Sequence, residues 1–443
     1  MRCPCEAAVA CPLRLMVAIV VGAGVVGATA TGANACPPAC PATSFLEPIR
    51  AAALEAGIKI PVPDAAALAH HHERPLTDRH FYKAVAKKQL DRWRESGIQR
   101  ADVDAALSVP RATKYQLDTT NGRLYRSEKC MFSMRCKGLE YFLGRALPTL
   151  KRRNRAGKKD IVELSVNVRD WPQSIDGMRD APVLSFSKKT DHEADIMYPA
   201  WAFWDGGPWL ATIPTWQWPA MRDELTAAAA ANPWGTKTAA VFFRGSRTSA
   251  ARDPFVLKGH ARRGQPPPPG AKRWNVRYIK NQSQRSNEIV EKEMALDFAE
   301  ATTMPEHCKY KYLLNFDGQA ASFRYKTLFL CGSLVLSVDL KWQEFWYSML
   351  IPWVHYVPLA GDGSDADTII DFLEAHQETA AMIAENGRQF VLQRLRMEDV
   401  QHYWDDLLTE YATLQAYTIP AIDSSLVEVD VPKHPPAGGK SEL

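Results

Sequence analysis

Short segments that are apolar at almost every position recur along the chain beyond residue 160 and are separated by helical ones. Residues 161–168, 183–186 and 239–243 are typical of strands, residues 225–231 are typical of an alanine-rich helix, and residues 328–336 form a further buried apolar run. Strands without polar alternation are buried on both faces, as in parallel sheets that helices cover. The alternation therefore predicts an α/β fold built on parallel sheets.

Length and composition limit the class of protein further. The chain has 443 residues, of which 46% are hydrophobic, 23% charged and 10% aromatic. At roughly 100–200 residues per domain, this length corresponds to two or three domains, and the composition excludes disordered, collagen-like and coiled-coil chains. With 54 Lys and Arg against 50 Asp and Glu, the net charge of +4 gives no indication of a nucleic-acid partner.

The N-terminus has the three parts of a secretory signal peptide in order. Arg2 and Arg14 are followed by the apolar run 15–28 and by the small-x-small sequence Ala33-Asn34-Ala35. The apolar run is shorter than the about 20 residues that a membrane-spanning helix needs, and no later stretch is long and apolar enough. Residues 1–35 are therefore interpreted as a signal peptide, and no transmembrane segment is predicted.

The same segment also contains a literal G-x-G-x-x-G at Gly22, Gly24 and Gly27, after an apolar run. Alone, this pattern is typical of a dinucleotide-binding βαβ unit. The helix that should follow would meet Pro37 and Pro38 within a few turns, so the unit cannot close. The signal peptide is the favoured interpretation.

The last four residues, Lys440-Ser441-Glu442-Leu443, differ at one position from the Lys-Asp-Glu-Leu retention signal. Retention requires prior entry into the endoplasmic reticulum, which a signal peptide provides. The two ends together predict the endoplasmic reticulum lumen, with the retention-signal receptor as a partner. In that compartment the N-x-S sequon at Asn281 is a candidate N-glycosylation site.

The cysteines fit the same compartment. The chain has nine, and three of them, Cys3, Cys5 and Cys11, lie in the predicted signal peptide. An even remainder in an oxidising compartment predicts up to three disulfides, and pairing of sequence neighbours is the simplest connectivity. A zinc site is the alternative, but no C-x-x-C is present and the spacings do not fit one. The remaining cysteines are Cys36, Cys40, Cys130, Cys136, Cys308 and Cys331.

Asp170 directly follows the predicted strand 161–168, in the sequence Arg169-Asp170-Trp171-Pro172. In open α/β sheets, ligands bind at the carboxyl ends of the strands. Asp170 is thus a candidate catalytic carboxylate, and the alternative for a lone Asp at this position is a turn or cap residue.

Two basic clusters predict an anion site in the second half. The strand 239–243 opens into Arg244, a glycine, hydroxyl side chains and Arg247, and Arg252 follows closely; a diphosphate is bound by such N–H groups, hydroxyls and guanidiniums. Small residues at 320–322 precede Arg324 and Lys326 at an expected helix start. A solvated face is the alternative for each cluster, but two of them together favour a phosphate-bearing ligand.

These segments also carry a resemblance to a known family. The chain resembles the Rumi-type protein O-glucosyltransferases of glycosyltransferase family 90, which also holds fungal capsule xylosyltransferases. The resemblance extends over roughly residues 115–417, in the same order and in long blocks. The blocks are residues 167–172 (Asn-Val-Arg-Asp-Trp-Pro), 185–188, 195–201, 207–208, 243–249, 252–254, 307–313, 320–326, 328–333 and 352–356.

The resemblance implies a GT-B architecture, in which two Rossmann-like domains face a cleft and no metal-binding D-x-D motif is used. The implied division is an N-terminal acceptor-side domain, a C-terminal nucleotide-sugar-binding domain, a C-terminal helix that returns to the N-terminal domain, and a tail with the retention signal. The corresponding ranges are 36–205, 206–395, 396–420 and 421–443.

Site residues follow from the resemblance position by position. The general base falls on Asp170, and disulfides Cys130–Cys136 and Cys308–Cys331 are supported. The donor contacts fall on Ser246, Arg252, Ala320, Ala321, Ser322, Phe323 and Arg324. The acceptor loop falls on Met131, Phe132, Ser133, Met134 and Arg135.

The activity implied by the resemblance is metal-independent, inverting transfer of glucose from UDP-glucose to Ser hydroxyls of EGF-like acceptors. The UDP-sugar is a co-substrate, and no cofactor or metal is expected. Four positions depart from the family pattern: Ile213 stands where relatives have Tyr, Asp317 and Gln319 where they have Arg and Val, and His402 where they have Cys. Two alternatives therefore stay open, namely a UDP-xylose-dependent or glycan-extending xylosyltransferase of the same family, and a non-catalytic retained glycan-binding protein.

Overall fold

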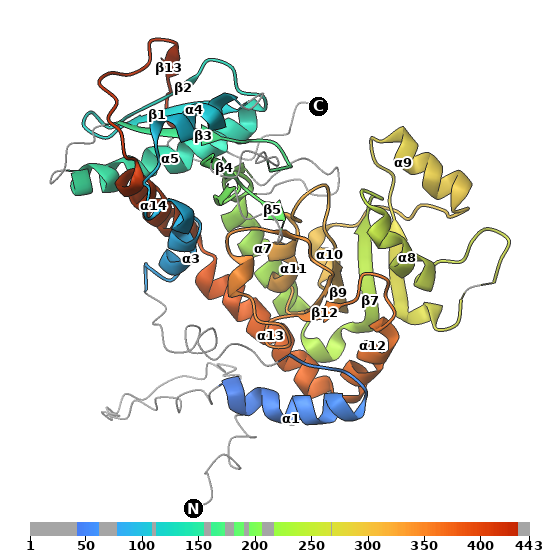
Figure 1. Ribbon diagram of the computed structural model, residues 1–443. Helices are drawn as coiled ribbons and strands as arrows, with labels where there is room; N and C mark the ends of the chain where they lie inside the picture. The colour runs from blue at the N-terminus through green and yellow to red at the C-terminus, as the bar shows by residue number, and fades with distance from the viewer. Residues whose placement is uncertain are drawn as a thin grey trace, which may run out of the picture. The chain divides into compact units, whose positions relative to one another are not determined.

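Two sheets, one parallel and one mixed, organise the protein (Figure 1). The computed structural model describes residues 42–61, 78–108, 112–154, 161–172, 181–189, 195–205, 217–266 and 268–432. All of these belong to one compact unit, Cys40–Leu443. The predicted signal peptide, Cys36, Cys40, Ile213 and the predicted retention signal lie outside the described residues.

The five-stranded sheet is parallel throughout, as its apolar strands predict. Leu313 and Leu336 on inner strands and Val276 on the edge strand are fully buried, because helices cover the sheet. Its strands, in spatial order, are β12 (Val357–Leu359), β10 (Leu334–Val338), β9 (Tyr310–Asn315), β7 (Thr238–Gly245) and β8 (Trp274–Tyr278). The helices around it are α7 (Trp218–Ala231), α8 (Asp253–Gly259), α11 (Tyr325–Leu330), α12 (Ala366–Ala375) and α13 (Gln377–Arg394).

The order of these strands reverses at β7. The next strand in the chain, β8, pairs with one edge of β7, and β9 pairs with the other. Open α/β sheets bind ligands outside the carboxyl ends of the strands at such a reversal. The residues that follow β7 and β9 are therefore where the fold places a ligand.

The six-stranded sheet is mixed, and here the prediction of parallel sheets is wrong. The strands β3, β4 and β6 pair in parallel, but β13, β2, β1 and β3 pair antiparallel. An Asn121-Gly122 turn, with Gly122 at φ 71°, folds β1 and β2 into a hairpin. The strands are β13 (Leu426–Glu428), β2 (Arg123–Ser127), β1 (Thr113–Asp118), β3 (Ile161–Val166), β4 (Val183–Ser185) and β6 (Ile196–Met197).

The C-terminal part of the chain packs on this mixed sheet. Helix α14 (Met397–Leu414) lies against α5 (Ser133–Asn154) and α3 (Lys83–Lys88), and the following segment adds β13 to the edge strand β2. The predicted tail 421–443 thus includes a strand of the sheet. The larger hydrophobic core contains Leu164 of β3, Leu313 of β9 and Trp404 of α14 together, so one apolar interior connects the two sheets.

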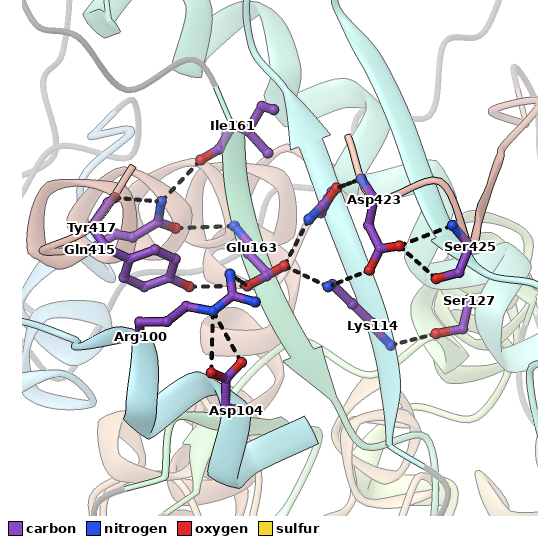
Figure 2. A network of polar contacts seen from close by, with 11 residues as sticks. Arg100, Asp104, Lys114, Ser127, Ile161, Glu163, Gln415, Tyr417, Asp423 and Ser425 are labelled. Atoms are coloured by element: carbon purple, nitrogen blue, oxygen red, sulfur yellow. Dashed lines mark hydrogen bonds and ion pairs between the residues drawn. The ribbon is translucent and has the colours of Figure 1, made fainter. Parts of the chain in front are cut away.

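A buried carboxylate joins the mixed sheet to this C-terminal segment (Figure 2). Glu163 of β3 is fully buried, and its carboxylate lies 2.9 Å from both Arg100 Nη1 and Lys114 Nζ. Its backbone N–H donates to Gln415 Oε1 at 3.1 Å, and Lys114 also pairs with Asp423 at 2.9 Å. Two cations satisfy the charge that burial would otherwise disfavour, and they fix the strand that leads to Asp170.

The remaining elements are short or peripheral. Helix α1 (Ala42–Glu55) places Leu46 and Ile49 in the second apolar cluster, on the parallel sheet. Within the described residues, no helix combines the length and apolarity needed to cross a membrane. Further elements are α4 (Arg100–Ser108), α6 (Ala202–Asp205), α9 (Gln284–Glu288), α10 (Met304–His307), and the paired strands β5 (Lys188–Lys189) and β11 (Trp342–Gln343). Single turns of 3-10 helix lie at Asp91–Trp93, Trp234–Thr236, Ala250–Arg252, Ala271–Arg273 and Tyr347–Met349, and a π-helical turn at Ile289–Glu293.

Two disulfides lie within the described residues. Cys130 is bonded to Cys136, and Cys308 to Cys331. Both are pairings of sequence neighbours, the simplest of the predicted connectivities. The first closes the segment that contains Met131, at the start of α5.

Candidate active site

A tight turn after β3 carries Asp170, and a buried asparagine shapes it. Asn167 is 1% exposed; its Oδ1 accepts from the backbone N–H of Arg169 at 2.8 Å. Its Nδ2 donates to the carbonyl of Trp171 at 2.7 Å and to Ser185 Oγ at 2.9 Å. Asn167 thus closes the turn on both sides of Asp170. Sequence reasoning assigned Asn167 no role, since its function depends on contacts made only in the folded turn.

The carboxylate of Asp170 is held on one side and open on the other. Its Oδ1 lies 3.1 Å from Arg135 Nη1, and its side chain is 43% exposed. The same Nη1 donates to the carbonyl of Val168 at 2.7 Å. An anchored carboxylate with an accessible oxygen can accept a proton from a hydroxyl group that approaches from solvent.

The predicted acceptor loop lies partly in a helix. Ser133, Met134 and Arg135 form the first turn of α5, and only Met131 and Phe132 precede it. The side chains of Met131 and Phe132 are exposed (41% and 37%), and the Arg135 guanidinium lies 4.4 Å from the ring centroid of Phe132. Arg135 therefore connects the exposed apolar residues to the Asp170 carboxylate.

Arg252 bridges the carboxyl ends of β7 and β9, at the reversal of strand order. It is 6% exposed, and its Nη1 donates to the carbonyl of Ser246 at 2.5 Å. Its Nη2 donates to the carbonyl of Asp317 at 2.9 Å. The structure thus brings the predicted donor residues Ser246 and Arg252 together at the position that the topology favours for a ligand.

A second guanidinium lies beside the first. Arg324, at the N-cap of α11, donates to the carbonyl of Arg244 at 2.5 Å. The guanidinium carbons of Arg252 and Arg324 lie 5.4 and 5.6 Å from the ring centroid of Phe243. Burial and the charge of Arg324 lower the pKa of Arg252 to about 10, and burial lowers the pKa of Arg324 to about 10.

Neither guanidinium has a carboxylate partner. Across the residues that the structure describes, no ion pair involves Arg252 or Arg324, and their hydrogen bonds go to backbone carbonyls. The buried Arg252 and the partly buried Arg324, without an ion-pair partner among the described residues, favour the binding of an anion, and a diphosphate matches two forked donors.

The carboxylate of Asp317 is hydrogen-bonded to the backbone of the segment that leads into β11. Its Oδ2 accepts from the backbone N–H groups of Lys341 and Trp342 at 2.7 and 3.1 Å. Burial raises its pKa to about 6. The carboxylate therefore holds the segment at β11 in place. The hydrogen bond from Arg252 goes to the Asp317 carbonyl.

The Asp170 turn and the donor segment are joined at two points. Trp171 Nε1 donates to the carbonyl of Gln319 at 2.8 Å, next to the buried Ala320 and Ala321. Phe323 packs against the buried ring of Trp201 at 5.5 Å between centroids, and Arg135 lies 5.0 Å from the same ring. The predicted base, acceptor residues and donor segment thus form one connected region. Sequence reasoning missed Trp201 and the role of Trp171, because both depend on contacts between distant segments.

Asn281, the candidate glycosylation site, lies in a turn before α9. Its Oδ1 accepts from the backbone N–H of Ser283 at 2.8 Å, and the residue is partly exposed. Among the described residues, no group of three His, Cys, Asp or Glu side chains is arranged to hold a metal ion.

Comparison with known proteins identifies the family of this chain. The model of the glycosyl transferase family 90 matches residues 77–438. Human protein O-glucosyltransferase 1 is 41% identical over 342 residues, which are 76% of this chain and 81% of the human protein. The O-glucosyltransferase rumi homolog of Aedes aegypti is 42% identical over 341 residues (76% and 78%), and O-glucosyltransferase rumi of Drosophila melanogaster is 40% identical over 346 residues (76% and 78%). The chain is a glycosyltransferase and belongs to glycosyl transferase family 90.

Proposed function

We propose that the protein transfers glucose from UDP-glucose to Ser hydroxyls of folded EGF-like acceptors in the endoplasmic reticulum lumen. The observation that carries the proposal is the bond between the Asp170 turn and the donor segment, from Trp171 Nε1 to Gln319 O at 2.8 Å. It ties a solvent-accessible carboxylate to the segment that presents Arg324. Relatives about 40% identical are named as O-glucosyltransferases, one of them as a protein O-glucosyltransferase, which supports glucose as the sugar and a protein as the acceptor here.

Asp170 acts as the general base in this proposal. Its free carboxylate oxygen accepts the proton of the Ser hydroxyl while the Ser oxygen attacks the anomeric carbon of glucose. The bond between the anomeric carbon and the phosphate oxygen breaks, and UDP leaves with the bonding electrons. Because attack and departure occur on opposite faces in one displacement, the configuration of the sugar inverts.

The two neighbouring arginines stabilise the leaving group. Negative charge grows on the β-phosphate as the bond breaks, and Arg252 and Arg324 offset it; their bonds to backbone carbonyls, which hold both guanidiniums in place, support this role. In a reaction without a metal ion, the two arginines take the role that a divalent cation has in metal-dependent transferases. A catalytic site of this kind needs no bound metal ion.

We further propose the GT-B architecture, with Rossmann-like domains over residues 36–205 and 206–395 and the donor in the second. The reversal of strand order at β7 supports the donor position. The disulfides Cys130–Cys136 and Cys308–Cys331 support an oxidising compartment, in agreement with the signal peptide and retention signal predicted from the sequence.

A donor and acceptor panel tests the proposal. UDP release is measured with UDP-glucose and UDP-xylose, each with and without a folded EGF-like domain, and the acceptor is weighed by mass spectrometry. We expect rapid release with UDP-glucose only when the acceptor is present, addition of one hexose, and no effect of EDTA. Pentose addition favours the xylosyltransferase alternative. That alternative stays open because Asp317 and Gln319, beside the donor segment, depart from the pattern expected for the family. Loss of activity in EDTA with recovery in Mn²⁺ contradicts metal independence.

A further inference from the structure

Trp171 is an exposed aromatic residue next to the proposed base. Trp171 is 53% exposed to solvent. The polar end of the indole is already occupied, because Nε1 donates to the carbonyl of Gln319 at 2.8 Å. What the residue offers to solvent is therefore its apolar ring, held in a fixed orientation.

The two segments that Arg135 joins at Asp170 carry exposed apolar side chains. Met131 and Phe132 are 41% and 37% exposed, and Phe132 is connected to Asp170 through Arg135, at 4.4 Å and 3.1 Å. Single exposed hydrophobic residues are ordinary, but apolar side chains grouped at a functional carboxylate mark an interaction site. Trp171, which follows Asp170 in the chain, adds a third exposed apolar side chain.

Chain geometry decides which part of the acceptor can reach Trp171. The reacting hydroxyl must lie within hydrogen-bond reach of Asp170, about 2.6–3.2 Å. Consecutive Cα atoms are about 3.8 Å apart both in the enzyme and in the acceptor. The exposed ring of Trp171, adjacent to Asp170, is therefore within reach of the residues next to the reacting Ser.

We propose that Trp171 is an acceptor-binding residue that packs against an apolar side chain next to the reacting Ser of a folded protein acceptor. This inference rests on the proposed function and adds a residue to its acceptor site. Burying an aromatic ring of this kind contributes strongly to protein–protein affinity, and Trp is common among the residues that dominate it. The same indole is hydrogen-bonded to Gln319. The residue that binds the acceptor is therefore also held by the donor segment.

Direct binding tests the inference separately from turnover. The dissociation constant of a folded EGF-like domain is measured by calorimetry with the UDP-loaded full-length protein, for the wild type, Trp171→Ala, Trp171→Phe and Met382→Ala. Met382 is a matched control, because it is similarly exposed (41%) but lies on α13. The affinity for UDP is measured for each variant as a check on the fold and the donor site.

We expect Trp171→Ala to weaken acceptor binding by roughly tenfold or more, as for residues that dominate an interface. Trp171→Phe should retain most of the affinity, and Met382→Ala all of it, with UDP affinity within about twofold of wild type throughout. Unchanged acceptor binding by Trp171→Ala, or an equal loss of UDP binding, overturns the inference, as does a wild type that does not bind the acceptor. Binding without any sugar transfer by the wild type instead contradicts the proposed function.

Discussion

Arg135 Nη1 lies 3.1 Å from Asp170 Oδ1. Since the same nitrogen donates to the carbonyl of Val168 at 2.7 Å, one guanidinium fixes both the carboxylate and the turn that carries it. The acceptor-side helix α5 thus controls the orientation of the proposed base. The disulfide Cys130–Cys136, at the start of that helix, fixes the position from which Arg135 extends.

Replacing Arg135 by Lys should lower kcat by roughly tenfold to a hundredfold with little change in UDP affinity, because an ammonium cannot reproduce the planar contacts of the guanidinium. Steady-state kinetics with an EGF-like acceptor and calorimetry with UDP measure the two quantities. Lys137→Gln, at an exposed position two residues further along α5, is the control. An Arg135→Lys enzyme with wild-type kcat would show that the contact is dispensable.

The paired cations predict how the protein responds to UDP. Arg324→Gln removes one of two charges that have no carboxylate partner among the described residues, so UDP affinity should fall by roughly tenfold to a hundredfold, as for a charge-assisted hydrogen bond worth about 1.5–3 kcal/mol. Thermal unfolding with increasing UDP reports this as a smaller rise in Tm. Arg285→Gln, a mostly exposed arginine on α9, serves as control. An unchanged UDP-dependent shift in Arg324→Gln contradicts the assignment of the diphosphate site.

Asp317 predicts a pH-dependent stability. Burial raises its pKa to about 6 in the folded protein, above the ordinary value of 3.8. The folded state therefore binds the proton more tightly, and stability falls as pH rises from about 4 to about 6. Asp317→Asn, which keeps an oxygen for the N–H groups of Lys341 and Trp342, should stabilise the protein at pH 7.5 by on the order of 1–3 kcal/mol.

Urea unfolding of Asp317→Asn and wild type at pH 7.5 and pH 4 measures this effect. The difference in the free energy of unfolding should be largest at pH 7.5 and much smaller at pH 4, where Asp317 is protonated in the folded protein. A difference that does not depend on pH would indicate that the substitution acts through packing rather than through the charge.

In the network around Glu163, replacing Glu163 should lower the free energy of unfolding more than replacing Arg100. Glu163→Gln leaves Lys114, which is 15% exposed, without part of its counter-charge, and should lower the free energy of unfolding by about 3–5 kcal/mol, as for other broken buried pairs. Arg100→Gln should cost less than about 1 kcal/mol, because the Arg100 side chain is 48% exposed. Equal losses in the two variants, measured by urea unfolding, contradict this account.

The parallel sheet, and the position of candidate site residues beyond strand ends, are predictable from sequence for a physical reason. Residues 240–243 of β7 and all of β10 are buried, so their apolar runs report their environment directly. Asp170 and Arg252 follow strands, where the polypeptide must expose polar groups at the sheet edge. Local sequence is sufficient for such positions.

The mixed sheet and the links within the site require information from distant parts of the chain. The addition of β13 to β2 depends on a polar segment whose own pattern is weak. The bond from Trp171 to Gln319 joins residues far apart in sequence, and nothing near either one indicates the other. The Asn121-Gly122 turn, in contrast, is a local hairpin signal that could have been read from the sequence.

Asp170→Asn tests the central claim most directly. Glucose transfer from UDP-glucose to a folded EGF-like domain is followed by mass spectrometry of the acceptor, and UDP affinity is measured by calorimetry on the same preparations. The amide keeps the shape of the side chain but cannot take the proton, so transfer should fall by at least about a thousandfold while UDP binds as in the wild type. Transfer at the wild-type rate by Asp170→Asn would contradict the role of Asp170 as the general base.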